Sequence, residues 1–184
     1  MEKKERDPLQ LTAADVEVGV LQTTAQAVKV RLWPKEEKIR AILNELYPSY
    51  GWSTDLFTVA GKTCCRLLIM GVFETDDVTV HHAALCPTEY RMISDQARNE
   101  MDGALIMAAS YIGIGEAVMQ LPAMVIRSDQ VQINPVADPS GKRIARYELA
   151  DTLTPTNLVY DDAGKIIEVD FTRRDGGVIK WQKR

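Results

Sequence analysis

The sequence has no apolar run near the ~20 residues that a membrane-spanning helix needs. Residues 1–7 carry charges of both signs and lack the apolar stretch of a secretory signal peptide. Cysteine is scarce as well: Cys64, Cys65 and Cys86 are the only three, and two of them are adjacent. Adjacent cysteines rarely bridge each other, and reduced thiols are typical of a reducing compartment. We therefore expect a cytoplasmic protein with no membrane partner.

The motifs of common catalytic chemistry are also missing. Only two histidines occur, so general acid–base catalysis has few candidate groups. No Gly-x-Ser-x-Gly elbow is present, and Gly113-Ile114-Gly115 lacks the Lys-Ser/Thr pair of a phosphate loop. His81 and His82 are neighbours in an expected strand and point to opposite faces, which argues against a shared metal ion. We expect a protein that is not an enzyme and holds no metal or cofactor.

The 184 residues are 46% hydrophobic and 26% charged, which is the composition of an ordinary globular domain. The net charge is −4 at pH 7. Strong non-specific binding to nucleic acid is usually accompanied by a basic protein, so DNA binding here would need a local basic surface.

Hydrophobic periodicity predicts an α+β fold with antiparallel strands. The expected helices are a short one between residues 7 and 20, one over 36–47 and a long one over 94–112. The expected strands cover 27–33, 53–59, 63–73, 78–85, 124–127, 131–133, 157–160 and 166–171, with a last one ending near 181. We expect residues 1–120 to form an α+β core and residues 121–184 a β-rich C-terminal extension of the same domain.

Three short motifs lie within this order of elements. The first is Ile39–Tyr47 followed by Tyr50-Gly51-Trp52, the second is the three-stranded segment 53–85, and the third is Ser94–Ala109 followed by Gly113-Ile114-Gly115. Together, over residues 36–115, they resemble the single-strand DNA annealing superfamily, which includes the eukaryotic recombination-mediator annealing protein and its phage and bacterial relatives.

The resemblance implies a three- to four-stranded antiparallel meander packed on the long helix. It also implies binding and annealing of single-stranded DNA in homologous recombination or repair, without ATP, by a homo-oligomeric ring or filament. Family members usually carry a Lys-Arg pair in the long helix, and Ile106 and Met107 stand at those positions here. Either other cations hold the DNA, or the chain is a divergent structural or interaction module with weak or no DNA binding.

Annealing requires cations that hold phosphates while the base edges stay free to pair. Residues 29–40 contain five cations and only two carboxylates, and strand alternation puts Lys29, Arg31 and Trp33 on one face. The candidate DNA-binding residues are Lys29, Arg31, Lys35, Lys38, Lys62, Arg66 and Arg98. The alternative for each is an ordinary solvated surface charge. A C-terminal basic cluster is interpreted as a solubility tail in preference to an accessory contact; it comprises Arg173, Arg174, Lys180, Lys183 and Arg184.

Overall fold

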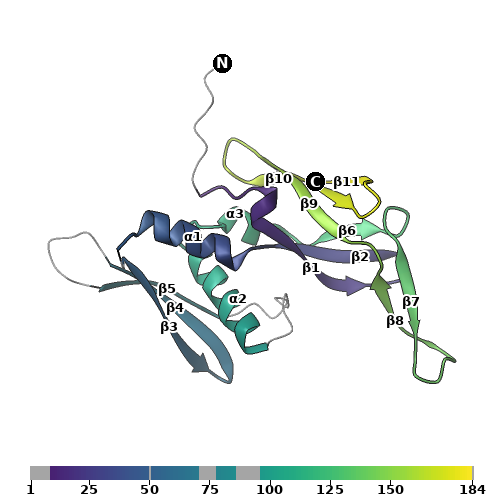
Figure 1. Ribbon diagram of the computed structural model, residues 1–184, viewed down its shortest axis with the longest axis horizontal. Helices are drawn as coiled ribbons and strands as arrows, with labels where there is room; N and C mark the ends of the chain where they lie inside the picture. The colour runs from purple at the N-terminus through teal and green to yellow at the C-terminus, as the bar shows by residue number, and fades with distance from the viewer. Residues whose placement is uncertain (1–8, 50, 71–77, 86–95, 184) are drawn as a thin grey trace, which may run out of the picture. The chain divides into compact units, whose positions relative to one another are not determined.

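The computed structural model describes residues 9–49, 51–70, 78–85 and 96–183, and for residues 70, 78–85 and 96–98 the description is limited to the backbone. The chain is mixed α and β, and the strand pairs of the described part are antiparallel (Figure 1). It divides into two compact units. Residues 1–11 and 34–120 form the helical unit, and residues 12–33 and 121–184 form the β unit.

The helical unit contains a three-stranded meander in the order β3-β4-β5. Its elements are α1 (Glu36–Leu46), β3 (Trp52–Val59), β4 (Lys62–Met70), β5 (Val78–Leu85), α2 (Gln96–Ser110) and α3 (Glu116–Met119). The β3–β4 turn places Ala60 at φ 50° and Gly61 at φ 74°. Two successive positive φ values match the right-handed twist of a tight hairpin. The predicted strand end at residue 73 and the helix start at Ser94 lie outside the described residues.

Helix α1 follows Pro34 and buries Ile39, Ile42 and Leu43, the apolar stripe that the sequence predicts. Indole Nε1 of Trp52, in β3, donates a hydrogen bond to Oδ1 of Asn44 in α1, 2.9 Å away. Trp52 pairs with Ile69 across the ladder, so it shares a face with the buried side chains of β4. Helix α1 therefore lies on that face of the meander.

Helix α2 contacts β4 and β5. Thr63 Oγ1 in β4 donates to Glu100 Oε2 in α2 at 2.6 Å, which places α2 on the same side of the meander as α1. The chain leaves α2 through Gly113 and Gly115, at φ 91° and 71°. A Cβ on Gly115 would lie 3.1 Å from Cγ of Pro34, so this position needs glycine for both its conformation and its space.

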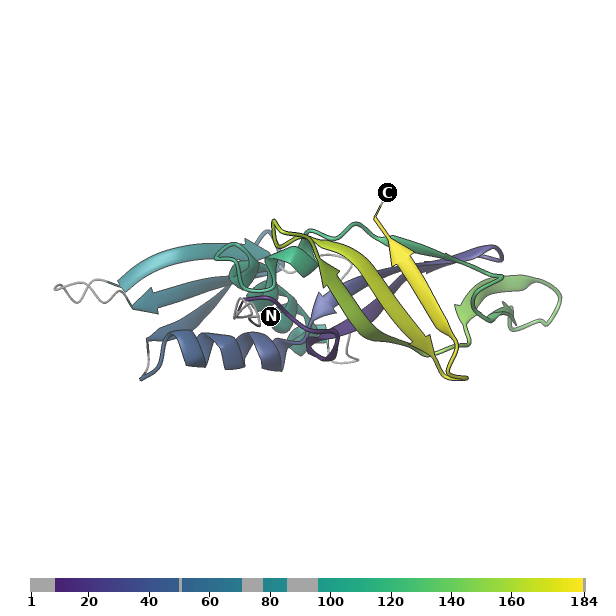
Figure 2. The same ribbon diagram turned by 90° about the horizontal axis from the view of Figure 1, so that it is seen from above.

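The β unit contains three sheets (Figure 2). The first sheet has the order β1-β2-β6 and comprises β1 (Val16–Thr23), β2 (Ala27–Pro34) and β6 (Met124–Arg127). The second sheet pairs β7 (Ile133–Ala137) with β8 (Ile144–Leu149). The third sheet has the order β9-β10-β11 and comprises β9 (Leu153–Tyr160), β10 (Ile166–Arg173) and β11 (Val178–Gln182). Val28, Val30 and Leu32 of β2 are buried with Met124 and Ile126 of β6. Alternation along each strand leaves the other face of this sheet for polar side chains.

The segment before β2 differs from the sequence prediction. Residues 16–23 form strand β1, and only a 3-10 turn over Ala13–Asp15 replaces the expected short helix. Asp15 Oδ2 accepts from Thr12 N and Oγ1 at 2.8 and 2.6 Å, which closes this turn locally. The alternating valines of residues 16–20 then favour extended backbone.

The division into units follows from one strand pair. Residues 12–33 group with residues 121–184 and not with the core over 34–120. The cause is the pairing of β2 with β6, whose register joins Lys29 to Val125. Sequence periodicity carries no information on such a distant strand pair. Strand β8 is a further element that the periodicity did not predict.

Candidate nucleic-acid interface

The seven predicted DNA-binding residues belong to both units. Lys29 and Arg31 are in β2 of the β unit, whereas Lys35 and Lys38 begin α1 in the helical unit. Lys62 and Arg66 are in β4, and Arg98 is in α2, where its side chain lies outside the description.

The outer face of the β2–β6 pair collects three cations. Lys29 pairs with Val125 and Ala27 pairs with Arg127, and residues paired in an antiparallel ladder share a face. Lys29 and Arg31 are two residues apart in β2, so Arg31 lies on this face too. We call Lys29, Arg31, Val125 and Arg127 the β2–β6 face. Arg127 was not among the predicted DNA-binding residues. The only local signal for its place on this face was its alternation along the strand with Met124 and Ile126, which are buried.

Exposure falls along β2 from Lys29 to Trp33. Lys29 is exposed, Arg31 is half-buried, and Trp33 is 0% exposed. The guanidinium of Arg31 lies 5.0 Å from the centre of the Trp33 ring, a cation–π contact that confirms their predicted common face. Trp33 thus supports Arg31 and offers no open ring on which a base could stack.

Asp129 offsets the charge of Arg127 on the β2–β6 face. Arg127 Nε donates to Asp129 Oδ1 at 3.2 Å, and a second guanidinium nitrogen pairs with the other oxygen of Asp129. Both side chains are largely exposed, so solvent and salt weaken this pair. Val125, 58% exposed, adds an apolar patch between the cations.

In the helical unit the predicted cations lie on two sides of the meander. Arg66 pairs with Asp55, and its guanidinium stacks 4.9 Å from the Phe57 ring on the face opposite α1 and α2. Arg66 Nη1 also lies 3.2 Å from Asp55 Oδ2, which neutralises it locally. Lys35 and Lys38 belong to the helix layer instead. Arg66 therefore does not line a common groove with these two lysines.

The positions of the missing Lys-Arg pair are part of the core of the helical unit. Ile106 is 1% exposed, and Met107 is half-buried with its sulfur 3.8 Å from Ser110 Oγ. A cation at residue 106 would have no access to phosphate in this packing. The departure from the family pattern is thus accompanied by apolar packing of α2.

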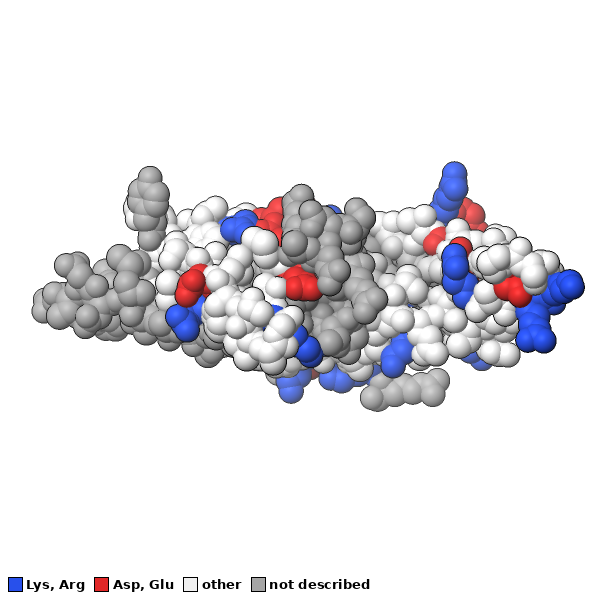
Figure 3. All heavy atoms as spheres, turned by 90° about the horizontal axis from the view of Figure 1, so that it is seen from below, with Lys and Arg blue, Asp and Glu red and all other residues white. Residues whose placement is uncertain are grey.

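The net charge of −4 gives the chain no overall attraction for a polyanion. In the view of Figure 3, Lys and Arg side chains are dispersed among uncharged and acidic ones, without a continuous basic band over the described residues. Any attraction for a polyanion must therefore come from local groups of cations such as the β2–β6 face.

Metal and nucleophile chemistry have little support in the described residues. No group of three or more His, Cys, Asp or Glu side chains lies close enough there to hold a metal ion. The side chains of His81 and His82, and the whole of Cys86, lie outside the description. Burial raises the pKa of the Cys65 thiol to about 11, so the group stays protonated near neutral pH and is a poor nucleophile.

Comparison with protein-family models, curated protein sequences and solved structures finds no match for this chain. Within the part that the structure describes, no helix has the length and apolarity needed to cross a membrane.

Proposed function

We propose that this chain binds single-stranded DNA and anneals complementary strands during recombination or repair, without catalysing a reaction. The observation that carries the proposal is the β2–β6 face. There Lys29, Arg31 and Arg127 come together from two strands distant in the chain, and Asp129 pairs with Arg127.

Such a face suits a sugar–phosphate backbone. Each cation that contacts a phosphate releases condensed counterions. The resulting gain in binding free energy does not depend on base sequence. Arg31 is already held against Trp33, so ordering its guanidinium on binding costs little further entropy. No open aromatic ring belongs to the β2–β6 face, so this face would hold the backbone without stacking on the bases.

The helical unit supports the proposal by its order of elements. A meander of β3, β4 and β5 with α2 against it, followed by the Gly113–Gly115 terminator, is what the resemblance to annealing proteins implies. Assembly into a ring or filament, and a cytoplasmic location, are parts of the same proposal.

The deciding experiment uses the full chain at low salt. Fluorescence anisotropy would measure affinity for labelled oligo(dT), and quenching of paired dyes would follow annealing of complementary oligonucleotides. We expect binding that weakens as salt rises, together with annealing faster than the spontaneous rate. Absence of binding at concentrations where the protein self-associates would overturn the proposal.

A second function is favoured by one observation, the complete burial of Ile106 where the family carries a cation. With a net charge of −4, the same fold could serve as a structural or interaction module. A stable oligomer by light scattering, together with no affinity for oligo(dT), would support this alternative.

A further inference from the structure

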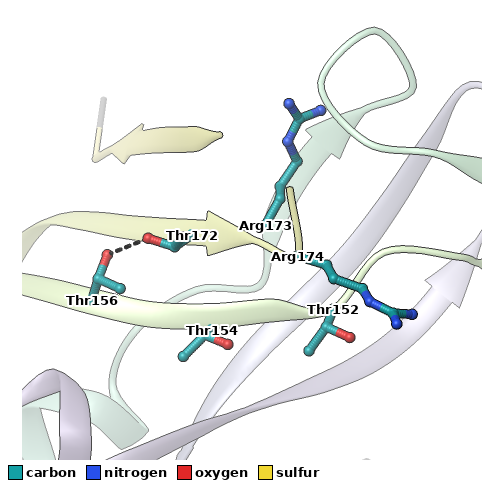
Figure 4. Close-up of a pocket in the computed structure, with 6 residues that line it drawn as sticks. All are labelled: Thr152, Thr154, Thr156, Thr172, Arg173 and Arg174. Carbon is teal, nitrogen blue, oxygen red and sulfur yellow. Dashed lines mark hydrogen bonds between the residues drawn. The ribbon is translucent and has the colours of Figure 1, made fainter. Parts of the chain in front are cut away.

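The basic pair Arg173-Arg174, interpreted above as part of a tail, lies instead at the end of strand β10 in the β unit. A groove of about 420 Å³ opens there (Figure 4). It is lined by Thr152, Thr154, Thr156, Thr172, Arg173 and Arg174. Its volume falls within the range of small-ligand sites.

Strand register explains why threonines gather in this groove. Thr172 of β10 pairs with Thr154 of β9, so the two side chains share a face. Thr152 precedes β9 and Arg174 follows β10, and both line the same groove. In Figure 4 the Arg174 side chain extends beside Thr152, whereas that of Arg173 points away from the row of threonines.

Hydrogen bonding leaves part of the groove available to a ligand. Thr172 Oγ1 donates to Thr156 Oγ1 at 3.2 Å, and Thr156 Oγ1 donates to the carbonyl oxygen of Asp170 at 3.3 Å. Within the described residues, no hydrogen bond or ion pair engages the side chains of Thr152, Thr154 or Arg174. The groove therefore offers two hydroxyl groups and one guanidinium group.

The lining of the groove includes two arginines and no carboxylate, although carboxylates lie nearby. Asp175, the next residue after Arg174, is held by Arg173 Nη2 at 2.8 Å. Asp151 accepts a hydrogen bond from the backbone N–H of Gln132 at 2.7 Å. Further along the same face, Lys180 lies 3.7 Å from Glu168 and 3.8 Å from Asp170. Arg174 is thus the cation of the groove with no carboxylate partner in the described part.

We propose that this groove binds one phosphate of a nucleic-acid backbone. The guanidinium of Arg174 supplies the charge, and the hydroxyls of Thr152 and Thr154 donate hydrogen bonds to the phosphate oxygens. The threonine methyl groups form a wall for the sugar. No aromatic side chain lines the groove, so it holds the backbone and not the base. This inference rests on the proposed single-stranded DNA binding and adds a contact separate from the β2–β6 face.

The test measures affinity for oligo(dT) over a range of salt with the full chain. Arg174→Ala should weaken binding by roughly fivefold to tenfold, since one charge-assisted contact is lost. The slope of log K against log salt should fall by about 0.7, the value for one phosphate on a single strand. The matched control is Arg146→Ala, which removes an exposed arginine of the same unit that Glu148 already holds at 2.7 Å. This control should change the affinity and the salt slope less than Arg174→Ala does.

Thr154→Val provides a readout that general loss of structure would not give. It removes a hydroxyl while keeping the shape and the charge, so affinity should fall about threefold with an unchanged salt slope. Thr58→Val, at an exposed position of β3, is its control. If wild type binds oligo(dT) and neither Arg174→Ala nor Thr154→Val differs from its control, the groove proposal is wrong and the proposed function stands.

A second assay separates the two proposals if wild type does not bind oligo(dT). Thermal unfolding is then followed with inorganic pyrophosphate, which presents phosphate oxygens without a sugar or base. Stabilisation of wild type but not of Arg174→Ala would keep an anion site in the groove while the annealing proposal fails. If pyrophosphate changes the thermal stability of wild type and Arg174→Ala equally, both the groove proposal and the annealing proposal are overturned.

Discussion

Arg173 and Arg174 are adjacent in the chain and both line the groove, yet their side chains point in different directions (Figure 4). Arg173 Nη1 donates to the carbonyl oxygen of Gln130 at 3.0 Å, and its Nη2 pairs with Asp175. Arg174 lies on the groove side with the threonines. The end of β10 at Arg173 thus divides one basic doublet into a residue that holds the fold and a residue that is available to a ligand.

The first prediction concerns this division. Arg173→Ala should lower the free energy of unfolding by about 0.5–1.5 kcal/mol, because it removes the hydrogen bond to Gln130 and the ion pair with Asp175. Arg174→Ala should change it by less than about 0.5 kcal/mol, as is usual for an exposed residue without partners. Urea denaturation of both variants measures the difference. Equal destabilisation would show that the two side chains do not have separate roles.

Gly177 supplies a second prediction about Arg173. A Cβ at residue 177 would overlap the Nη2 and Nε atoms of Arg173, so Gly177→Ala should displace this guanidinium and destabilise the protein. In the double variant with Arg173→Ala the overlap is gone. The combined loss should therefore be smaller than the two single losses added together, by about 0.5 kcal/mol or more. Strict additivity in urea denaturation would contradict this contact.

The third prediction tests the β2–β6 face. Lys29→Ala combined with Arg127→Ala should weaken binding to oligo(dT) and reduce the salt slope by about 0.7 for each lost phosphate contact. Arg31 is left intact because its stacking on Trp33 also supports the strand. The control is Arg146→Ala combined with Lys165→Ala, which removes the same charge from exposed positions of the β unit. Matching slopes for the two double variants would remove the β2–β6 face from the interface.

Two glycines with similar backbone angles offer a fourth prediction. Gly61 and Gly115 have φ values of 74° and 71°, but a Cβ on Gly61 meets nothing within 4 Å, whereas one on Gly115 approaches Pro34 Cγ at 3.1 Å. Gly61→Ala should cost about 1 kcal/mol for the left-handed conformation alone. Gly115→Ala should cost more, because the overlap is added. Chemical denaturation compares them, and a cost for Gly115→Ala no larger than for Gly61→Ala would contradict the close packing.

The fifth prediction follows from the raised pKa of Cys65. Its pKa is about 11 in the folded chain against 9.0 for a free thiol, so above pH 9.0 the unfolded chain loses this proton first. Stability should therefore fall between these two pH values and should not change on this account below them. Cys65→Ala removes this pH-dependent contribution of the thiol to stability. The unfolding free energies of wild type and variant are measured at several pH values, and their difference should shrink as pH rises from 9.0 to about 11. A constant difference would show that burial does not perturb the thiol.

Local patterns in the sequence predicted the elements whose causes are local. The stripe of Ile39, Ile42 and Leu43 identified α1, because helical period and burial coincide there. The bounds of β3 and the position of the β3–β4 turn were predicted to within a residue or two. Prediction failed for the short helix expected between residues 7 and 20, where the structure has a single 3-10 turn followed by β1. The alternating valines that follow determine the extended backbone.

Sequence by itself determined a mixed fold with antiparallel strands, an acidic chain with scattered basic segments, and the set of cations from which the proposed interface is drawn. Tertiary structure decided which of those cations share a surface. It joined Arg127 to Lys29 through the β2–β6 ladder, separated Arg66 from the lysines of α1, and turned Arg174 toward a row of threonines. The reason is physical: strand pairing between distant segments depends on how the whole chain buries its apolar faces, and no local periodicity encodes that choice.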